Sequence, residues 1–270
     1  SHQADGFGSF SDWEGLAVYV DGALTEIPDP LPDLFTDQND TVDFSQVRRG
    51  DYVDGTQYNA GDGDDHVTQA DAPRAAAQAG YSTRRGFDAG DGDDTVQGGA
   101  FADTVAGGSG ADSLAGNAAS DSLSGDAGDD TIAGGSGRDT IRGGAGDDRI
   151  SVTDDEAESD LMDGGAGTDT LFSDGDFSLS GSATLADIEA IEIEGGGTVY
   201  GTASGDRLDF SDIESLQGVE AFDGGWGNDT LTGPETVAAT LRGGAGGDSL
   251  SGGQQGDSLD GGDGNDSLSG

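Results

Sequence analysis

Aspartate recurs at every ninth position through much of this sequence, a spacing regular enough to support chemistry. Seven consecutive nonapeptides occupy residues 89–151, from AGDGDDTVQ to GGAGDDRIS. All thirteen copies place Asp at position six and an aliphatic residue at position eight, and ten have Gly at position four. Carboxylate oxygens beside glycines, which leave backbone carbonyls accessible, are donors that the hard cation Ca²⁺ prefers. The other six copies begin at Ala60, Gly164, Gly224, Gly243, Gly252 and Gly261.

These nonapeptides resemble the repeat G-G-x-G-x-D-x-U-x of the RTX (repeats-in-toxin) family, which binds calcium. The resemblance covers about half of the chain directly. It implies an all-β fold, a right-handed parallel β-roll or solenoid, in which six residues of each repeat turn and three form a short strand. Two nonapeptides then complete one coil, and turn Asp residues and turn carbonyls hold several Ca²⁺ ions between coils.

The residues themselves support this interpretation. The chain has only two His, one Met and no Cys, so softer metals lack their preferred donors. Alternation along each three-residue strand sends one aliphatic side chain inward, which gives a stacked core row. In the continuous array that row is Val96, Val105, Leu114, Leu123, Ile132, Ile141 and Ile150.

If alternate repeats stack, the two edges of the roll are unequal. On the strong edge every turn of the continuous array keeps Gly at position four, whereas Phe101 and Ala119 stand there on the weak edge. We expect about six well-formed calcium sites on the strong edge and few or none on the weak edge, which carries Asp103, Asp121 and Asp139.

The predicted metal ligands are aspartates at position six and glycines at position four. The aspartates are Asp65, Asp94, Asp112, Asp130, Asp139, Asp148, Asp169, Asp229, Asp248 and Asp266. The glycines are Gly92, Gly110, Gly128, Gly146, Gly167, Gly227, Gly246 and Gly264.

Composition indicates that metal binding and folding are coupled. The formal net charge is −45, and Leu, Ile, Val and Phe make up about 17% of the residues, below the roughly 20% expected of a globular chain. One buried aliphatic side chain per repeat, about 1.5–3 kcal/mol, does not offset the ordering of nine residues at roughly 1–2 kcal/mol each. We therefore expect the chain to be disordered without calcium.

Charge and composition also exclude several classes of protein. The negative charge repels nucleic acid and anionic lipid, no apolar run is long enough to span a membrane, and the absence of Cys excludes disulfides. Residues 1–30 show no signal-peptide pattern and the array runs to Gly270, so we take the chain to be part of a longer protein.

Four regions are expected along the chain. Residues 1–58 are out of register and predict a strand-rich N-terminal cap, with the tail of a preceding domain as the alternative. Residues 59–172 form a first repeat block, interrupted at residues 69–88 by a surface loop or a ligand-binding insertion. Residues 173–223 predict a degenerate, metal-poor solenoid section with a larger apolar core, and residues 224–270 a second repeat block.

No enzymatic activity is expected. His66 has no nucleophile arranged around it, and the abundant carboxylates are accounted for by calcium. Asp29-Pro30 resembles the bond cut in self-processing modules of some RTX proteins, but the rest of such a module is not recognisable. Position three of the repeats lacks the regular Thr row of ice-binding β-rolls.

The functional expectation is a calcium-binding module that folds outside the cell. It serves as a stalk or structural block of a secreted surface protein or adhesin, located extracellularly or on the cell surface. The alternative is the C-terminal secretion and stability module of an RTX protease, lipase or epimerase. Calcium is the expected ligand, the chain is expected to be monomeric, and the full-length protein would use a type I secretion machinery.

Overall fold

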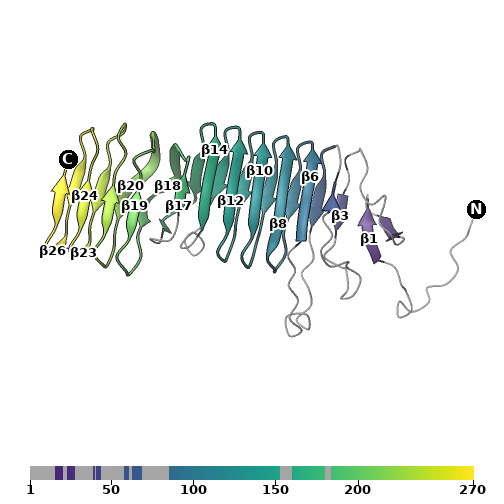
Figure 1. Ribbon diagram of the computed structural model, residues 1–270, viewed down its shortest axis with the longest axis horizontal. Coiled ribbons are helices and arrows are strands. Elements are labelled where there is room, and N and C mark those ends of the chain that lie inside the picture. Colours follow the sequence, from purple (N-terminus) through teal and green to yellow (C-terminus); the bar gives the residue numbers. More distant parts are fainter. Residues whose placement is uncertain are drawn as a thin grey trace, which may run out of the picture.

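The computed structural model is an elongated parallel β-solenoid of about nine coils (Figure 1). No helix occurs in the part of the chain that it describes, and so none that could cross a membrane. Most of the predicted cap, and residues 69–84 of the predicted insertion, lie outside the described residues. The described residues are 16–20, 23–27, 39, 41–43, 58–60, 63–68, 85–152, 160–179 and 184–270.

One large sheet runs the length of the solenoid and is joined strand by strand in parallel from β3 onward. Its path after the N-terminal strands is β3 (Thr41–Asp43), β5 (His66–Thr68), β7 (Thr95–Gln97), β9 (Ser113–Ala115), β11 (Thr131–Ala133), β13 (Arg149–Ser151), β15 (Thr170–Ser173), β18 (Ala190–Tyr200), β20 (Ser215–Asp223), β22 (Thr240–Arg242) and β25 (Ser258–Asp260).

The other strands of the coils form separate sheets in the two halves of the molecule. In the N-terminal half they are β4 (Tyr58–Asn59), β6 (Arg85–Asp91), β8 (Asp103–Ser109), β10 (Ser122–Ala127), β12 (Thr140–Ala145), β14 (Leu161–Ala166) and β17 (Thr184–Ala186). In the C-terminal half they are β19 (Arg207–Asp209), β21 (Thr230–Thr232), β24 (Ser249–Ser251) and β27 (Ser267–Ser269), with a further pair β23 (Ala245–Gly246) and β26 (Asp263–Gly264).

The strand register confirms that two nonapeptides complete one coil. Ile132 pairs with Leu114 on one side and Ile150 on the other, each 18 residues away. Leu123 on the opposite sheet pairs likewise with Ile141. All seven residues of the predicted inner row are buried, at 2% exposure or less. The aliphatic position eight therefore forms the continuous core on which the turns are mounted.

An antiparallel hairpin lies at the N-terminal end of the large sheet. Its strands β1 (Leu16–Val20) and β2 (Ala23–Ile27) pair with each other, and β1 also pairs antiparallel with β3. A strand arrangement of this kind at the end of a solenoid is consistent with the predicted cap role of residues 1–58, which remains a proposal.

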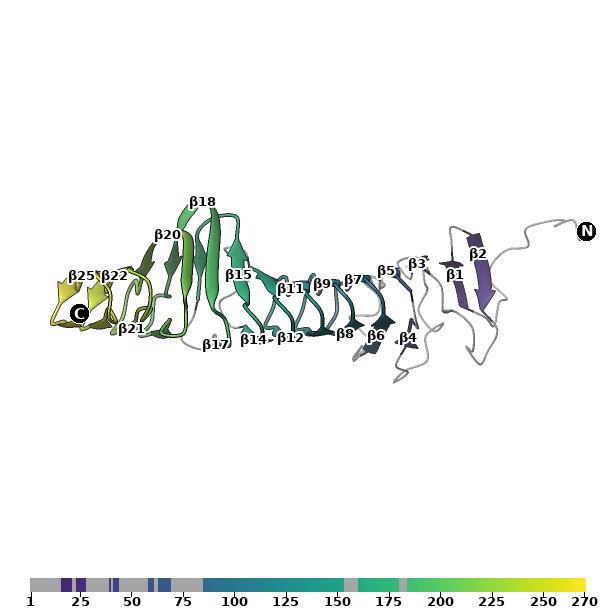
Figure 2. The same cartoon turned by 90° about the horizontal axis from the view of Figure 1, so that it is seen from above.

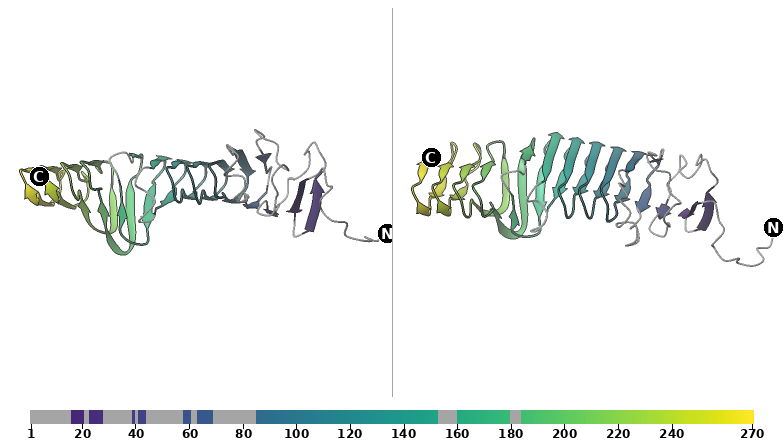
Figure 3. Two further views of the ribbon diagram at one scale, coloured as in Figure 1. Left: turned by 90° about the horizontal axis from the view of Figure 1, so that it is seen from below. Right: turned by 60° about the horizontal axis from the view of Figure 1, so that its bottom comes forward.

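The section between the two repeat blocks has longer strands and a larger core, as expected. β18 has 11 residues and β20 has nine, and both project beyond the line of the short strands (Figures 2 and 3). Phe177, Phe210 and Phe222 are almost completely buried there, and the rings of Phe210 and Phe222 stack with centroids 4.0 Å apart. Burial of these rings gives the middle section more apolar stabilisation than the single aliphatic side chain per repeat gives the short coils.

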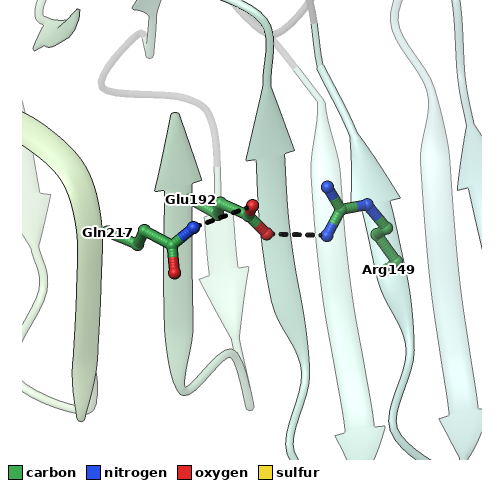
Figure 4. Close-up of polar contacts among 3 residues, drawn as sticks. All are labelled: Arg149, Glu192 and Gln217. Atoms are coloured by element: carbon green, nitrogen blue, oxygen red, sulfur yellow. Dashed lines mark hydrogen bonds and ion pairs between the residues drawn. The ribbon is translucent and has the colours of Figure 1, made fainter. Parts of the chain in front are cut away.

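The two repeat blocks join different parts of these long strands. The start of β18 pairs with β15, whereas its end pairs with β16 (Phe177–Ser178). The second block begins from the end of β20, which pairs with β22. On the outer face Arg149 lies over the Phe172 ring at 3.7 Å and donates to Glu192 at 2.9 Å, and Gln217 donates to the same carboxylate (Figure 4).

Candidate metal sites in the turns

The position-six aspartates form rows that run from coil to coil. In each row the backbone N–H of one Asp donates to Oδ1 of the Asp one coil later, at 2.7–2.9 Å in the N-terminal strong-edge row. These are charge-assisted bonds inside a buried environment, so they fix the carboxylates in place. The row comprises Asp65, Asp94, Asp112, Asp130, Asp148 and Asp169.

The weak edge carries an equivalent row, which sequence reasoning undervalued. It runs through Asp103, Asp121 and Asp139 to Asp160, with the same bonds at 2.7–2.8 Å. Asp160 belongs to a degenerate nonapeptide, residues 155–163, and the register continues through it into the next repeat. A missing position-four glycine has not broken the row.

The C-terminal block repeats the arrangement with the edges exchanged. Its row begins at Asp206 of the middle section and continues through Asp229, Asp248 and Asp266, with bonds of 2.7–3.0 Å. These turns lead away from the large sheet, whereas the glycine-complete turns of the first block lead into it. Turns with Gly at position four are therefore concentrated on one edge in both blocks. In the first block that edge lies at the amino ends of the large-sheet strands, and in the second block it lies at their carboxyl ends.

A second ladder runs along the turns at position five. Oδ1 of Asp93 accepts the N–H of Ala111 in the next coil, and Oδ1 of Asp129 and Asp147 likewise accept the N–H at position five of the next coil, each at 2.8 Å. Asn228 does the same in the second block, at 2.7 Å. These exposed carboxylates add negative charge beside the buried aspartate row.

The second oxygen of many row aspartates is buried and has no hydrogen-bond donor among the described residues. We call a turn with such an Oδ2 an open turn. The open turns end at Asp94, Asp112, Asp121, Asp130, Asp148, Asp169, Asp229, Asp248 and Asp257. A buried carboxylate oxygen without a hydrogen-bond donor is costly, so each of these oxygens is a candidate ligand for a cation.

Eight of these nine oxygens lie against the position-one glycine of their own turn, and the ninth belongs to Asp94, whose turn has Ala89 at position one. A Cβ on Gly107 would overlap Oδ2 of Asp112, and the carbonyl oxygen of Gly125, one coil later, would lie 2.8 Å from it. At Gly224 the corresponding distances are 2.7 Å to Oδ2 of Asp229 and 2.8 Å to the next carbonyl. The absence of a side chain thus leaves a space where a carboxylate and a carbonyl oxygen converge from adjacent coils.

Two turns satisfy the same carboxylate oxygen with the chain's own donors. The N–H of Gly99 donates to Oδ2 of Asp103 at 2.9 Å. The N–H of Thr202 donates to Oδ2 of Asp206 at 2.6 Å, and the Thr202 hydroxyl also donates to that carboxylate. We call residues 98–103 and 201–206 closed turns.

Burial and repulsion between neighbouring carboxylates raise the pKa values of several open-turn aspartates in the first block. Burial, as the largest cause, raises the pKa of Asp112 and Asp148 to about 6 and that of Asp121 and Asp130 to about 7. The backbone N–H of the preceding row Asp acts in the opposite direction, and neighbouring carboxylates raise the values further. A divalent cation in the row would favour the charged form.

Calcium fits this donor set. Among the described residues no three His, Cys, Asp or Glu side chains gather into a metal cage, so an ion here needs main-chain oxygens as well. Most of the turns offer such a carbonyl beside the buried Oδ2, and Ca²⁺ accepts 6–8 oxygen ligands in flexible geometry. The residues that would hold it are the row aspartates and the carbonyls of the stacked turns.

Most of the predicted ligands occupy one common environment. All eight predicted glycines have φ between 133° and 156°, and a Cβ on Gly110 would overlap the carbonyl oxygen of Gly92. Asp266 lies in the last coil, where it still accepts the N–H of Asp248 at 3.0 Å. Asp65 and Asp139 are buried members of their rows.

Asp121 and Asp257 share the open-turn environment, although the sequence argument left them out. Ala119 adopts φ +83° and so imitates the glycine it replaces, at the cost of strain. Phe101 has no positive φ, and its turn is closed. The regular placement of Asp at position six was the signal that would have included Asp121 and Asp257.

Comparison with known proteins agrees with this geometry. The family model described as RTX calcium-binding nonapeptide repeat (4 copies) matches half of the chain. No curated protein matches it significantly. The matched residues are 88–123, 124–153, 154–177, 221–233 and 239–270.

Proposed function

Because the chain belongs to the family of RTX calcium-binding nonapeptide repeat proteins, we propose that calcium converts it from an unfolded chain into a rigid extracellular rod. RTX repeats bind Ca²⁺ and form a structural module. The supporting observation is the row of buried Oδ2 atoms without donors among the described residues, most of them beside a carbonyl oxygen from the next coil. The metal-free fold leaves these charges uncompensated, whereas the ion joins adjacent coils, so binding free energy becomes folding free energy.

The place of folding follows from where calcium is available. Calcium is scarce in the bacterial cytosol and plentiful outside, so the chain stays unfolded inside and folds after export. A type I secretion machinery acting on the full-length protein suits such a chain. The net charge of −45 keeps the metal-free chain expanded and soluble.

Within a larger protein we favour a stalk or structural block of a secreted surface protein or adhesin. The elongated solenoid, the irregular repeats and the wide middle section suit a spacer. The alternative, a C-terminal stability module of a secreted enzyme, rests on the same repeats and differs in the domain that adjoins them. The division into residues 1–58, 59–172, 173–223 and 224–270 belongs to this proposal.

Calcium and magnesium titrations followed by small-angle X-ray scattering test the proposal. We expect millimolar Ca²⁺ to convert an expanded chain into a monomeric rod. Mg²⁺ at the same concentration should not, because it requires a tight octahedron and gives up water reluctantly. Equal compaction by both ions would contradict the turn-site mechanism, and a compact globule with calcium would contradict the stalk role.

A further inference from the structure

The strong-edge aspartate row of the first block continues past its last regular turn. Asp169 is the last residue of the open turn 164–169 and is completely buried. Its Oδ1 accepts the N–H of Asp148 at 2.8 Å, but its Oδ2 has no hydrogen-bond donor among the described residues. Every earlier open turn of this edge faces another nonapeptide turn, whereas this one faces the start of the middle section.

The next turn is short and lies outside every range that the family model matches. Three residues, Asp187, Ile188 and Glu189, connect β17 to β18. Ile188 is buried at 2% exposure and anchors the turn to the core. Asp187 has φ +48°, one of the few non-glycine residues in the left-handed region. Such strain at a turn persists where surrounding contacts hold it.

This short turn presents the same groups to Asp169 as a regular turn. A Cβ on Gly164 would overlap the carbonyl oxygen of Asp187 and lie 2.6 Å from Oδ2 of Asp169. The Asp187 carbonyl thus takes the place of the position-one glycine carbonyl of a regular coil. Oε2 of Glu189 accepts the N–H of Asp169 at 2.8 Å, as the next row Asp would. The extra methylene of Glu compensates for the residues that the turn lacks.

Negative charge gathers at this junction, and no ion pair among the described residues balances it. Burial raises the pKa of Asp169, and the carboxylates of Glu189, Asp147 and Asp187 raise it further. The two ion pairs of the described residues, Arg149 with Glu192 and Arg207 with Asp209, involve none of these groups.

We propose that the junction holds one more Ca²⁺ ion, bound by Oδ2 of Asp169, the main-chain carbonyl of Asp187 and the carboxylate of Glu189. The inference rests on the proposed calcium function and extends it to a turn without the repeat consensus. It also gives the middle section a role, because this ion fastens the first repeat block to the long strands. Water completes the coordination sphere.

The test counts bound ions on the full chain, by equilibrium dialysis against radioactive calcium at a saturating concentration. Glu189→Gln keeps an oxygen for the N–H of Asp169 but removes the charge, and we expect one ion fewer per chain than in the wild type. Glu194→Gln is the matched control, because Glu194 is an exposed residue of β18. It should leave the count unchanged.

Two further variants separate the contributing groups. Asp187→Asn should leave the count unchanged, because the ligand is its carbonyl. If Glu189→Gln does not fold in calcium, Glu189→Asp replaces it; the shorter carboxylate should again cost one ion. An unchanged count in a folded Glu189 variant would overturn the inference, whereas a wild-type chain without bound calcium would contradict the proposed function itself.

Discussion

Two neighbouring turns of the first block treat the same carboxylate in opposite ways. In the closed turn 98–103, Gly99 donates its N–H to Oδ2 of Asp103. In the open turn 107–112, nothing among the described residues donates to Oδ2 of Asp112. Both aspartates nevertheless join adjacent coils through the hydrogen bonds between a backbone N–H and Oδ1 that make up the rows. The comparison separates the structural use of Asp from its use as a ligand.

The backbone at position two of the turn distinguishes the two states. It has positive φ in every open turn, including +114° at Gly108 and, without glycine, +72° at Asn117 and +73° at Asp126. Neither Gly99 nor Thr202, at position two of the closed turns, has positive φ. Asn and Asp tolerate this region better than other non-glycine residues. The open state is therefore encoded by backbone conformation, and glycine is its commonest but not its sole carrier.

Filling the space between two coils with a side chain should cause the largest loss of calcium-dependent stability. Gly107→Ala places a Cβ where Oδ2 of Asp112 and the carbonyl of Gly125 converge, so calcium is excluded and the coils are pushed apart. We expect a loss of about 2 kcal/mol or more in calcium-dependent stability, measured by urea unfolding at saturating calcium. Gly247→Ala is the control, because its Cβ would approach nothing closer than 3.4 Å. Equal losses would refute the convergent-oxygen site.

Removing the negative charge of one row aspartate should weaken calcium-dependent folding in an open turn more than in a closed turn. The difference should be smaller than the effect of Gly107→Ala. Asp112→Asn keeps an acceptor for the N–H of Asp94 but loses the anionic ligand, and we expect the calcium midpoint of folding to rise, equivalent to about 0.5–1.5 kcal/mol. Asp103→Asn should shift that midpoint little, because Gly99 already satisfies the carboxylate. A calcium titration followed by tryptophan fluorescence measures both. A larger shift for Asp103→Asn would reverse the assignment of the turns.

Acid should partly replace calcium in the open turns. The folded pKa values of Asp112 and Asp130, about 6 and 7, lie above the ordinary 3.8. Raised values mean that protonation stabilises the metal-free fold; this contribution is complete below pH 3.8 and is lost as pH rises through 6–7. Calcium-stripped protein should therefore show more β structure by circular dichroism at pH 4.5 than at pH 7.5. More structure at the higher pH would contradict the raised values.

Relieving strain in the one open turn with Ala at position four should have the smallest effect. Ala119→Gly removes a Cβ at φ +83°, which favours the folded state by about 1 kcal/mol, partly offset by the greater freedom of Gly in the unfolded chain. A modest rise in thermal midpoint at fixed calcium is expected. The reverse substitution at Gly137 should be strongly destabilising, because its Cβ would overlap the carbonyl oxygen of Ala119.

The fold was predictable because one short pattern determines it repeatedly. Asp at position six and an aliphatic residue at position eight fixed the register, the 18-residue coil and the inner row from Val96 to Ile150. The wide middle section was recognisable from the alternation of Ile191 and Ile193 with Glu192 and Glu194. Local periodicity is the strongest signal that a single chain carries.

The state of individual turns was less predictable, because it depends on backbone angles. Position four predicted a weak turn at Ala119, but Asp121 is open like the others, and so is Asp257, whose turn has Gln255 at position four. The turn with Phe101 at position four is closed by the N–H of Gly99, a hydrogen bond that no residue type in the repeat indicates. Glu189 carries no repeat signature at all; it substitutes for an Asp only because the chain between β17 and β18 is three residues long.

Far-ultraviolet circular dichroism of the full chain, recorded first with chelator and then with millimolar Ca²⁺ at pH 7.5, tests the central claim most directly. The buried, unpartnered aspartate oxygens predict that the metal-free chain is largely disordered and that calcium produces a β-rich spectrum. An identical β-rich spectrum in both conditions would contradict the account, because it would mean that the carboxylate rows are stable without the ion.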